Sequence, residues 1–177
     1  ENEACLRLPG IDGKAKMSKS LGNCIYLSDE PEEVRKKIMS MYTDPDHIRV
    51  QDPGKIEGNT VFTYLDAFCK PEHFERYWPE YANLDELKAH YQRGGLGDVK
   101  VKKFLNNVLQ EELEPIRQRR KELQKDIPAI YEILKEGSAK AREVAAQTLH
   151  DVRDAMKINY FDDVDLIASQ SEKFRQD

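Results

Sequence analysis

Apolar residues recur every three or four positions through most of the second half of the chain. This spacing puts apolar side chains on one face of an α-helix, so long helices are predicted there. Pro115 lies inside the first run and predicts a kink, and Ser138 is predicted to cap a later helix. The residues that set the rhythm are Val101, Phe104, Leu105, Val108, Leu109, Leu113, Ile116, Leu123 and Ile127, and later Ala141, Val144, Ala145, Thr148, Leu149, Val152 and Met156.

The first half predicts shorter helices separated by turns. Pro31 is expected in the first turn of a helix capped by residues 28–30, and Pro71 opens another. Asn59 or Thr60 should cap a helix between these two, and Asn83 one that ends at residues 94–95. Residues 43–58 contain three Asp or Glu turns and predict a structured loop, whereas residues 1–27 look irregular, with a brief extended stretch at 24–27. The predicted fold is mostly α: an irregular N-terminal segment followed by a helical bundle.

Composition excludes several classes of protein. Charged residues make up 34% of the chain, and no apolar run approaches the roughly 18 residues that a membrane span needs. The three cysteines form no CxxC pair and the four histidines show no HExxH spacing, so neither a disulfide framework nor a structural metal is expected. No secretory signal is visible. A cytoplasmic protein without a membrane partner fits these features best.

The charge distribution argues against a protein that coats nucleic acid indiscriminately. The net charge is −5, but residues 94–125 hold eight Lys or Arg against five Asp or Glu. The basic residues concentrate on one predicted helix, where they could meet RNA phosphates. The alternative is a solvated helix face whose cations pair with Glu114, Glu122 and Asp126. The cluster consists of Arg117, Arg119, Arg120, Lys121 and Lys125.

The segment with the clearest chemical content is the basic loop, residues 10–23, with the sequence GIDGKAKMSKSLGN. Lysines supply mobile positive charge, hydroxyls and backbone N–H groups bind phosphate oxygens, and glycines let the loop open and close. A Walker-type loop fails on spacing, since Gly10-x-x-Gly13-Lys14 is too short and Ala15 stands where Ser or Thr would hold Mg²⁺. A plain solvated surface loop is the alternative.

Residues 16–20 read KMSKS, the signature of class I aminoacyl-tRNA synthetases, and their setting resembles the tryptophanyl enzymes. The flanks LPGIDG and LGN look like that family. So do four later blocks in the same order, and the resemblance spans roughly residues 8–160. The later blocks are TDP at 43–45, DPG at 52–54 with EGNTVF at 57–62, GGLGDVK at 94–100 and LEPIR at 113–117.

The resemblance implies an ATP-dependent ligase that forms tryptophanyl-adenylate and passes tryptophan to tRNA(Trp). Lys16 and Lys19 would be the catalytic cations at the ATP phosphates, with Lys19 as the contact formed in the transition state. Met17, Ser18 and Ser20 would complete the ATP-binding loop, with Ser20 bracing it. Mg²⁺ would accompany ATP, and no metal ligand is assigned to this chain.

The resemblance also implies a division of the chain. Residues 1–27 would end the catalytic domain, residues 28–160 would form the helical anticodon-binding domain, and residues 161–177 an acidic tail. His-x-Gly-His and a βαβ pattern are both missing from the sequence, so the Rossmann half that binds L-tryptophan and adenosine is expected elsewhere in a longer, homodimeric enzyme. This piece alone should be inactive. A tyrosyl-tRNA synthetase fragment and a non-enzymatic helical module that binds RNA or a partner are the alternatives.

Overall fold

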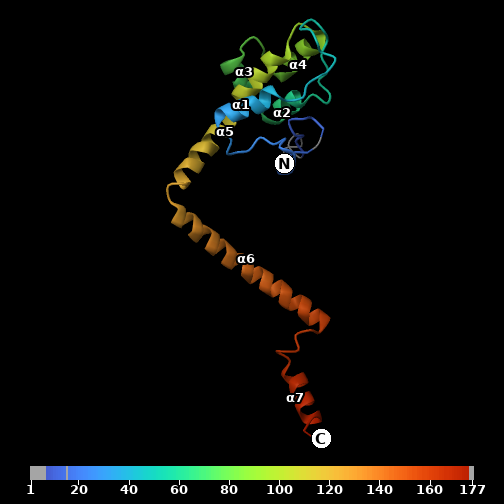
Figure 1. Cartoon of the computed structure of the whole chain (residues 1–177), viewed down its shortest axis with the longest axis vertical. Helices are drawn as coiled ribbons and strands as arrows, with labels where there is room; N and C mark the ends of the chain where they lie inside the picture. Colours follow the sequence, from blue (N-terminus) through green and yellow to red (C-terminus); the bar gives the residue numbers. More distant parts are fainter. Residues whose placement is uncertain (1–6, 15, 176–177) are drawn as a thin grey trace. The chain divides into compact units, whose positions relative to one another are not determined.

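The computed structural model of the chain describes residues 7–14 and 16–175, and their regular structure is helical (Figure 1). No strand occurs in that part of the chain, where an isolated antiparallel bridge joins Pro9 to Lys16. The mostly α prediction is therefore confirmed. The helices are the short 3₁₀-helix η2 (Lys19–Leu21), then α1 (Pro31–Met39), α2 (Thr60–Phe68), α3 (Pro71–Tyr77), α4 (Leu84–Arg93), α5 (Asp98–Leu123), α6 (Ile127–Met156) and α7 (Val164–Lys173).

The chain packs as two compact units, Glu1–Glu122 and Leu123–Asp177. The first unit contains the basic loop and a hydrophobic core to which α1, α2, α3, α4 and α5 all contribute buried residues. The second unit contains α6 and α7, which bury none of their residues. The domain boundaries expected after residues 27 and 160 remain predictions.

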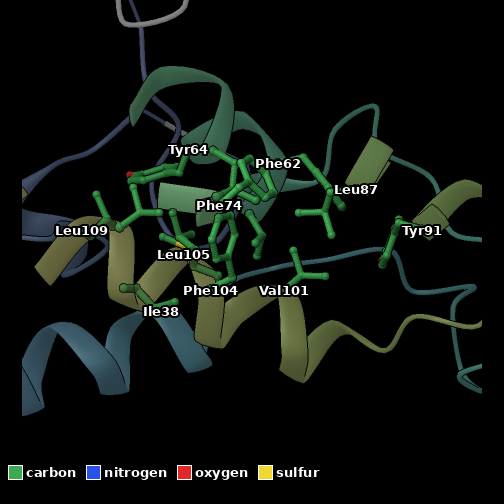
Figure 2. Close-up of a cluster of buried hydrophobic side chains, with 14 of the residues drawn as sticks. Ile38, Phe62, Tyr64, Phe74, Leu87, Tyr91, Val101, Phe104, Leu105 and Leu109 are labelled. Atoms are coloured by element: carbon green, nitrogen blue, oxygen red, sulfur yellow. The ribbon is translucent and has the colours of Figure 1, made fainter. Parts of the chain in front are cut away.

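The core of the first unit forms along one face of α5 (Figure 2). Phe104 packs against Phe74 of α3, with ring centroids 4.7 Å apart, and Leu105 is fully buried. Each fully buried side chain of this size contributes roughly 1.5–3 kcal/mol relative to an exposed one. The buried residues of this face repeat at helical spacing as predicted: Val101, Phe104, Leu105, Val108, Leu109 and Leu113.

The predicted caps of α2 and α4 are confirmed. The Asn59 side-chain oxygen accepts a hydrogen bond from the Val61 N–H at 3.1 Å, and that of Asn83 accepts one from the Glu86 N–H at 3.0 Å. Gly94 ends α4 with a positive φ of 88°. These bonds satisfy N–H groups that the first turn of a helix otherwise leaves unpaired.

The cap predicted for α1 is only partly right. Helix α1 begins at Pro31, but the Glu30 side chain makes no capping hydrogen bond. The Asp29 carboxylate instead accepts from the Tyr26 N–H and from the Lys37 ammonium, at 2.8 and 2.6 Å. Asp29 therefore closes the turn before the helix.

The prediction that Ser138 caps a helix is wrong. Helix α6 runs from Ile127 to Met156 without interruption, and Asp126 caps it by accepting from the Ala129 N–H at 3.1 Å. Asp126 followed by Pro128 in the first turn makes a stronger start than Ser138, because both residues favour a helix N-terminus. Helix α5 continues through Pro115 to Leu123. The kink at Pro115 stays a prediction, and helix α7 in the acidic tail was not predicted.

Candidate functional site

The stem of the basic loop is fixed to the helical core at several points. The Ile11 N–H donates to the Asn23 carbonyl at 3.0 Å, and the Ile11 carbonyl accepts from the Tyr42 N–H at 2.8 Å. On the other side, the Tyr64 hydroxyl of α2 donates to the Pro9 carbonyl at 2.7 Å. The loop therefore leaves the core from a defined position.

Gly13 ends the first turn of the basic loop, residues 10–13, where it is tightly packed and has a φ of 69°. Its N–H donates to the Gly10 carbonyl at 2.9 Å. A Cβ at Gly13 would lie 2.7 Å from the Thr60 hydroxyl oxygen and 2.8 Å from the Tyr42 ring. Glycine is required here both by the left-handed backbone and by the space available.

The two predicted catalytic lysines are on the surface. Lys16 and Lys19 are exposed, and no ion pair joins either of them to another residue in the described part of the chain. Lys19 begins η2, which Gly22 ends with a φ of 65°. Within the described part of the chain, neither lysine has a carboxylate partner that would reduce its attraction for an anionic ligand.

The remaining predicted loop residues lie between and beside these lysines. Met17 and Ser18 are half-buried, and Ser20 is exposed. The Ser18 and Ser20 hydroxyl oxygens are 2.8 Å apart and share a hydrogen bond. Ser20 therefore contacts the loop itself, and its bracing role stays a prediction.

Sequence reasoning missed Asn23, which the structure puts at the centre of the basic loop. Its side chain is 4% exposed. In the sequence, Asn23 belongs to the LGN flank at the end of the basic loop and was given no role of its own, because hydrogen bonds between residues on opposite sides of a loop leave no mark in local composition.

Tyr64 gives a test of how firmly the loop stem is held. Burial raises the pKa of Tyr64 to about 12, so its hydroxyl remains a donor at neutral pH. Tyr64→Phe should lower the free energy of unfolding by about 1 kcal/mol. The pKa of Tyr64 is higher in the folded state than in the unfolded state. The difference in unfolding free energy between the two proteins should therefore hold below about pH 10 and vanish as the pH approaches 12. Urea unfolding of both proteins at pH 7 and pH 11 measures it, and an equal difference at both pH values would contradict it.

A second polar site lies at the N-terminus of α5. The Asp98 carboxylate accepts from the Tyr91 hydroxyl at 2.6 Å, from the Thr43 hydroxyl at 2.8 Å and from His47 Nδ1 at 3.2 Å. His47 is buried, and its Nε2 has no hydrogen-bond partner within the described residues. Burial raises the pKa of Tyr91, and the hydrogen bond to Asp98 adds to the shift, so this hydroxyl stays a donor.

A hollow of about 370 Å³ opens beside this network. Arg49 and Lys100 put positive charge on its wall, and the first turn of α5 presents backbone N–H groups there. Its apolar wall includes Ile48, whose side chain is 84% exposed. We call this the α5 pocket; it is lined by His47, Ile48, Arg49, Val50, Gly97, Asp98, Val99 and Lys100.

The basic cluster on α5 is smaller than predicted. Arg117 is 3% exposed and pairs with Glu114 at 2.8 Å, so it belongs to the core of the bundle. Lys121 lies 3.7 Å from Glu30, while Arg119 and Arg120 are exposed. The prediction that Arg117 could face RNA is not supported.

Three aromatic residues of α3 and the turn after it, Tyr77, Trp78 and Tyr81, could stack on RNA bases, but they contribute mostly to packing. Trp78 lies edge-on to Tyr81 and Phe104, at centroid distances of 5.0 and 5.5 Å. Tyr77 is partly exposed, and its hydroxyl donates to Glu111 at 2.7 Å. Contacts within the bundle thus hold these three side chains in place.

The described residues, 7–14 and 16–175, lack two further kinds of feature. They hold no group of three or more His, Cys, Asp or Glu side chains arranged to bind a metal ion. Among them there is also no helix both long and apolar enough to cross a membrane.

The sequence is similar to that of a known protein family. Residues 6–114 match the model of the family described as tRNA synthetases class I (W and Y). The chain is 66% identical over 158 residues to the tryptophan–tRNA ligase of Clostridium longisporum, covering 89% of this chain and 44% of the relative. It is 59% identical over 161 residues to that of Streptococcus pyogenes serotype M3, covering 91% of this chain and 45% of the relative.

A solved structure gives the same result for the fold. Tryptophanyl-tRNA synthetase from Campylobacter jejuni, complexed with ADP and tryptophan, is 27% identical to the chain and superposes with a TM-score of 0.64. The match covers 85% of this chain and 43% of that structure. The chain thus spans less than half the length of the curated relatives and of the solved structure that it matches.

Proposed function

The chain belongs to the family of class I tRNA synthetases for tryptophan and tyrosine, and on that premise we propose that it is the C-terminal part of a tryptophan–tRNA ligase. The naming of its relatives at 66% and 59% identity as tryptophan–tRNA ligases supports tryptophan over tyrosine. The observation that carries the proposal is the basic loop, on which Lys16 and Lys19 are exposed and form no ion pair with another described residue, and whose stem is fixed to the helical core.

In the intact enzyme, the tryptophan carboxylate attacks the α-phosphorus of ATP. Tryptophanyl-adenylate forms and pyrophosphate leaves with the electron pair of the broken P–O bond. Lys16 and Lys19 lie over the phosphates and neutralise the charge that grows on the leaving group, which lowers the barrier. Met17, Ser18 and Ser20 shape the loop around them, and backbone N–H groups add donors. Mg²⁺ is carried by the ATP phosphates.

The rest of the chain has a separate role in this proposal. Residues 1–27 end the catalytic domain, residues 28–160 bind tRNA(Trp), and residues 161–177 form a tail. L-tryptophan and adenosine bind mainly on the half of the enzyme that the relatives have beyond this match. The enzyme works as a homodimer in the cytoplasm.

The α5 pocket is the surface that fits an RNA nucleotide best. Arg49 and Lys100 supply cations for phosphate, and the apolar side chains of Ile48, Val50 and Val99 offer a face for a base that leaves its stack. The exposed apolar side chains and the two cations line one and the same hollow.

Substitution of Lys100 tests that assignment. Lys100→Ala in the intact enzyme should weaken tRNA binding and reduce the slope of log Kd against log salt by about 1. Lys103→Ala, the same change of charge on an exposed residue of α5 outside the pocket, is the matched control. Equal effects of the two substitutions on tRNA binding would show that the α5 pocket does not contact the tRNA. ATP–pyrophosphate exchange, which needs no tRNA, checks that the catalytic site is intact.

The proposed function itself is tested by amino-acid-dependent exchange. The intact enzyme should exchange pyrophosphate into ATP when tryptophan is present and not when tyrosine replaces it. Tyrosine-dependent exchange would identify the tyrosyl alternative, and no exchange with either would favour a non-enzymatic helical module. The 177-residue chain alone should give no exchange. Robust activity from it would overturn the division of the active site.

A further inference from the structure

The side chain of Asn23 connects both halves of the basic loop. Its Oδ1 accepts from the Ser18 N–H at 2.8 Å. Its Nδ2 donates to the Asp12 carboxylate at 3.2 Å and to the Lys16 carbonyl at 3.4 Å. Since the side chain is only 4% exposed, these bonds are largely shielded from water.

Two of these bonds are made to the backbone on either side of Met17. Lys16 and Ser18 flank Met17, so Asn23 holds the backbone on both sides of the central residue of the motif. Ser18 in turn is the residue from which η2 and Lys19 start. One carboxamide therefore fixes the backbone from which both exposed lysines extend.

Gly10 packs closely against the Asn23 side chain. A Cβ at Gly10 would lie 2.1 Å from Asn23 Nδ2 and 2.4 Å from its Cγ. Aspartate at position 23 has the same size but no donor, and its charge would face the Asp12 carboxylate and the Lys16 carbonyl. Only asparagine has an acceptor for Ser18 and donors for the other two groups at this size.

We propose that Asn23 is a positioning residue for adenylate formation, which holds the backbone of residues 16–18 so that Lys16 and Lys19 meet the ATP phosphates. This inference rests on the proposed function of the basic loop. It adds a residue that acts through the lysines and does not itself touch ATP.

The test measures tryptophan-dependent exchange by the intact enzyme carrying Asn23→Asp. The kcat should fall about 10- to 100-fold, because a small displacement of a catalytic group costs that much. The KM for tryptophan should stay within about twofold, since the bound amino acid does not contact this loop. Gly10→Ala should give the same pattern by pushing Asn23 aside, without altering any hydrogen-bonding group. It also serves as the second variant if Asn23→Asp folds poorly.

A matched control separates positioning from stability. Asn59 is equally buried and makes a comparable set of bonds, to the Lys55 carbonyl, the Tyr91 hydroxyl and the Val61 N–H. Asn59→Asp should lower the melting temperature at least as much as Asn23→Asp, yet change kcat less than about threefold. If the two variants lose kcat in equal proportion, Asn23 has a structural role only and the inference is overturned.

A double-mutant cycle with Lys19 distinguishes failure of this inference from failure of the proposed function. In the Lys19→Ala background, Asn23→Asp should cost clearly less than it does in the unsubstituted enzyme, because one of the two groups that it positions is gone. Independent, multiplying effects would refute positioning while leaving the role of Lys19 intact. If Lys19→Ala has no effect by itself, the proposed function of the loop fails and the positioning role fails with it.

Discussion

Replacing Lys19 by alanine in the intact enzyme should reduce the kcat of tryptophanyl-adenylate formation by about 100-fold or more. The ammonium group lies on an exposed loop and forms no ion pair with another described residue, so its charge is available to the ligand. In this mechanism, the contact strengthens as charge builds on the departing pyrophosphate. A contact of that kind lowers kcat rather than raising KM, so the KM for tryptophan should change less than about twofold.

The measurement is ATP–pyrophosphate exchange with tryptophan, and the matched control is Lys14→Ala. Lys14 is exposed on the same loop, and its loss changes the net charge equally. A drop confined to Lys19→Ala shows that the position of the cation matters. Equal drops would mean that the loop acts only through its overall charge, and unchanged exchange in Lys19→Ala would end the case for a phosphate-handling loop.

Local sequence rules predicted those parts of the fold that depend on neighbouring residues. Asn59 and Asn83 cap their helices as expected, because a capping bond spans only two or three residues. The buried face of α5 was likewise predicted, since its apolar period is set by the helix itself. The Ser138 prediction was wrong because Asp126 and Pro128 together make a stronger helix start earlier in the chain, and the helix then continues through Ser138.

The features that sequence reasoning missed depend on contacts between distant residues. Arg117 reads as part of a basic surface cluster, yet it is 3% exposed and its guanidinium donates to Gln110 and Glu114. Asn23 looks like a turn residue, yet it bonds to groups five, seven and eleven positions away. The KMSKS motif could be found in the sequence, whereas the residue that holds its backbone could be found only in three dimensions.

The largest loss of stability is expected from Asp98→Ala, which should lower the free energy of unfolding by about 3 kcal/mol or more. Asp98 accepts hydrogen bonds from Thr43 and His47 in the loop after α1 and from Tyr91 in α4. Tyr91 and His47 are buried, so alanine would leave their donors without this acceptor and away from water. The loss also removes a carboxylate from the positive end of α5.

Unfolding of the 177-residue chain in urea, followed by the fluorescence of its one tryptophan, measures this effect. Trp78 packs against Phe104 of α5, so its emission reports on the first unit. Asp85→Ala removes an exposed carboxylate from the first turn of α4 and should cost less than about 1 kcal/mol. A similar small cost for Asp98→Ala would show that the three hydrogen bonds contribute little. A large cost would mean that the Asp98 carboxylate, which lines the α5 pocket, also stabilises the helical domain.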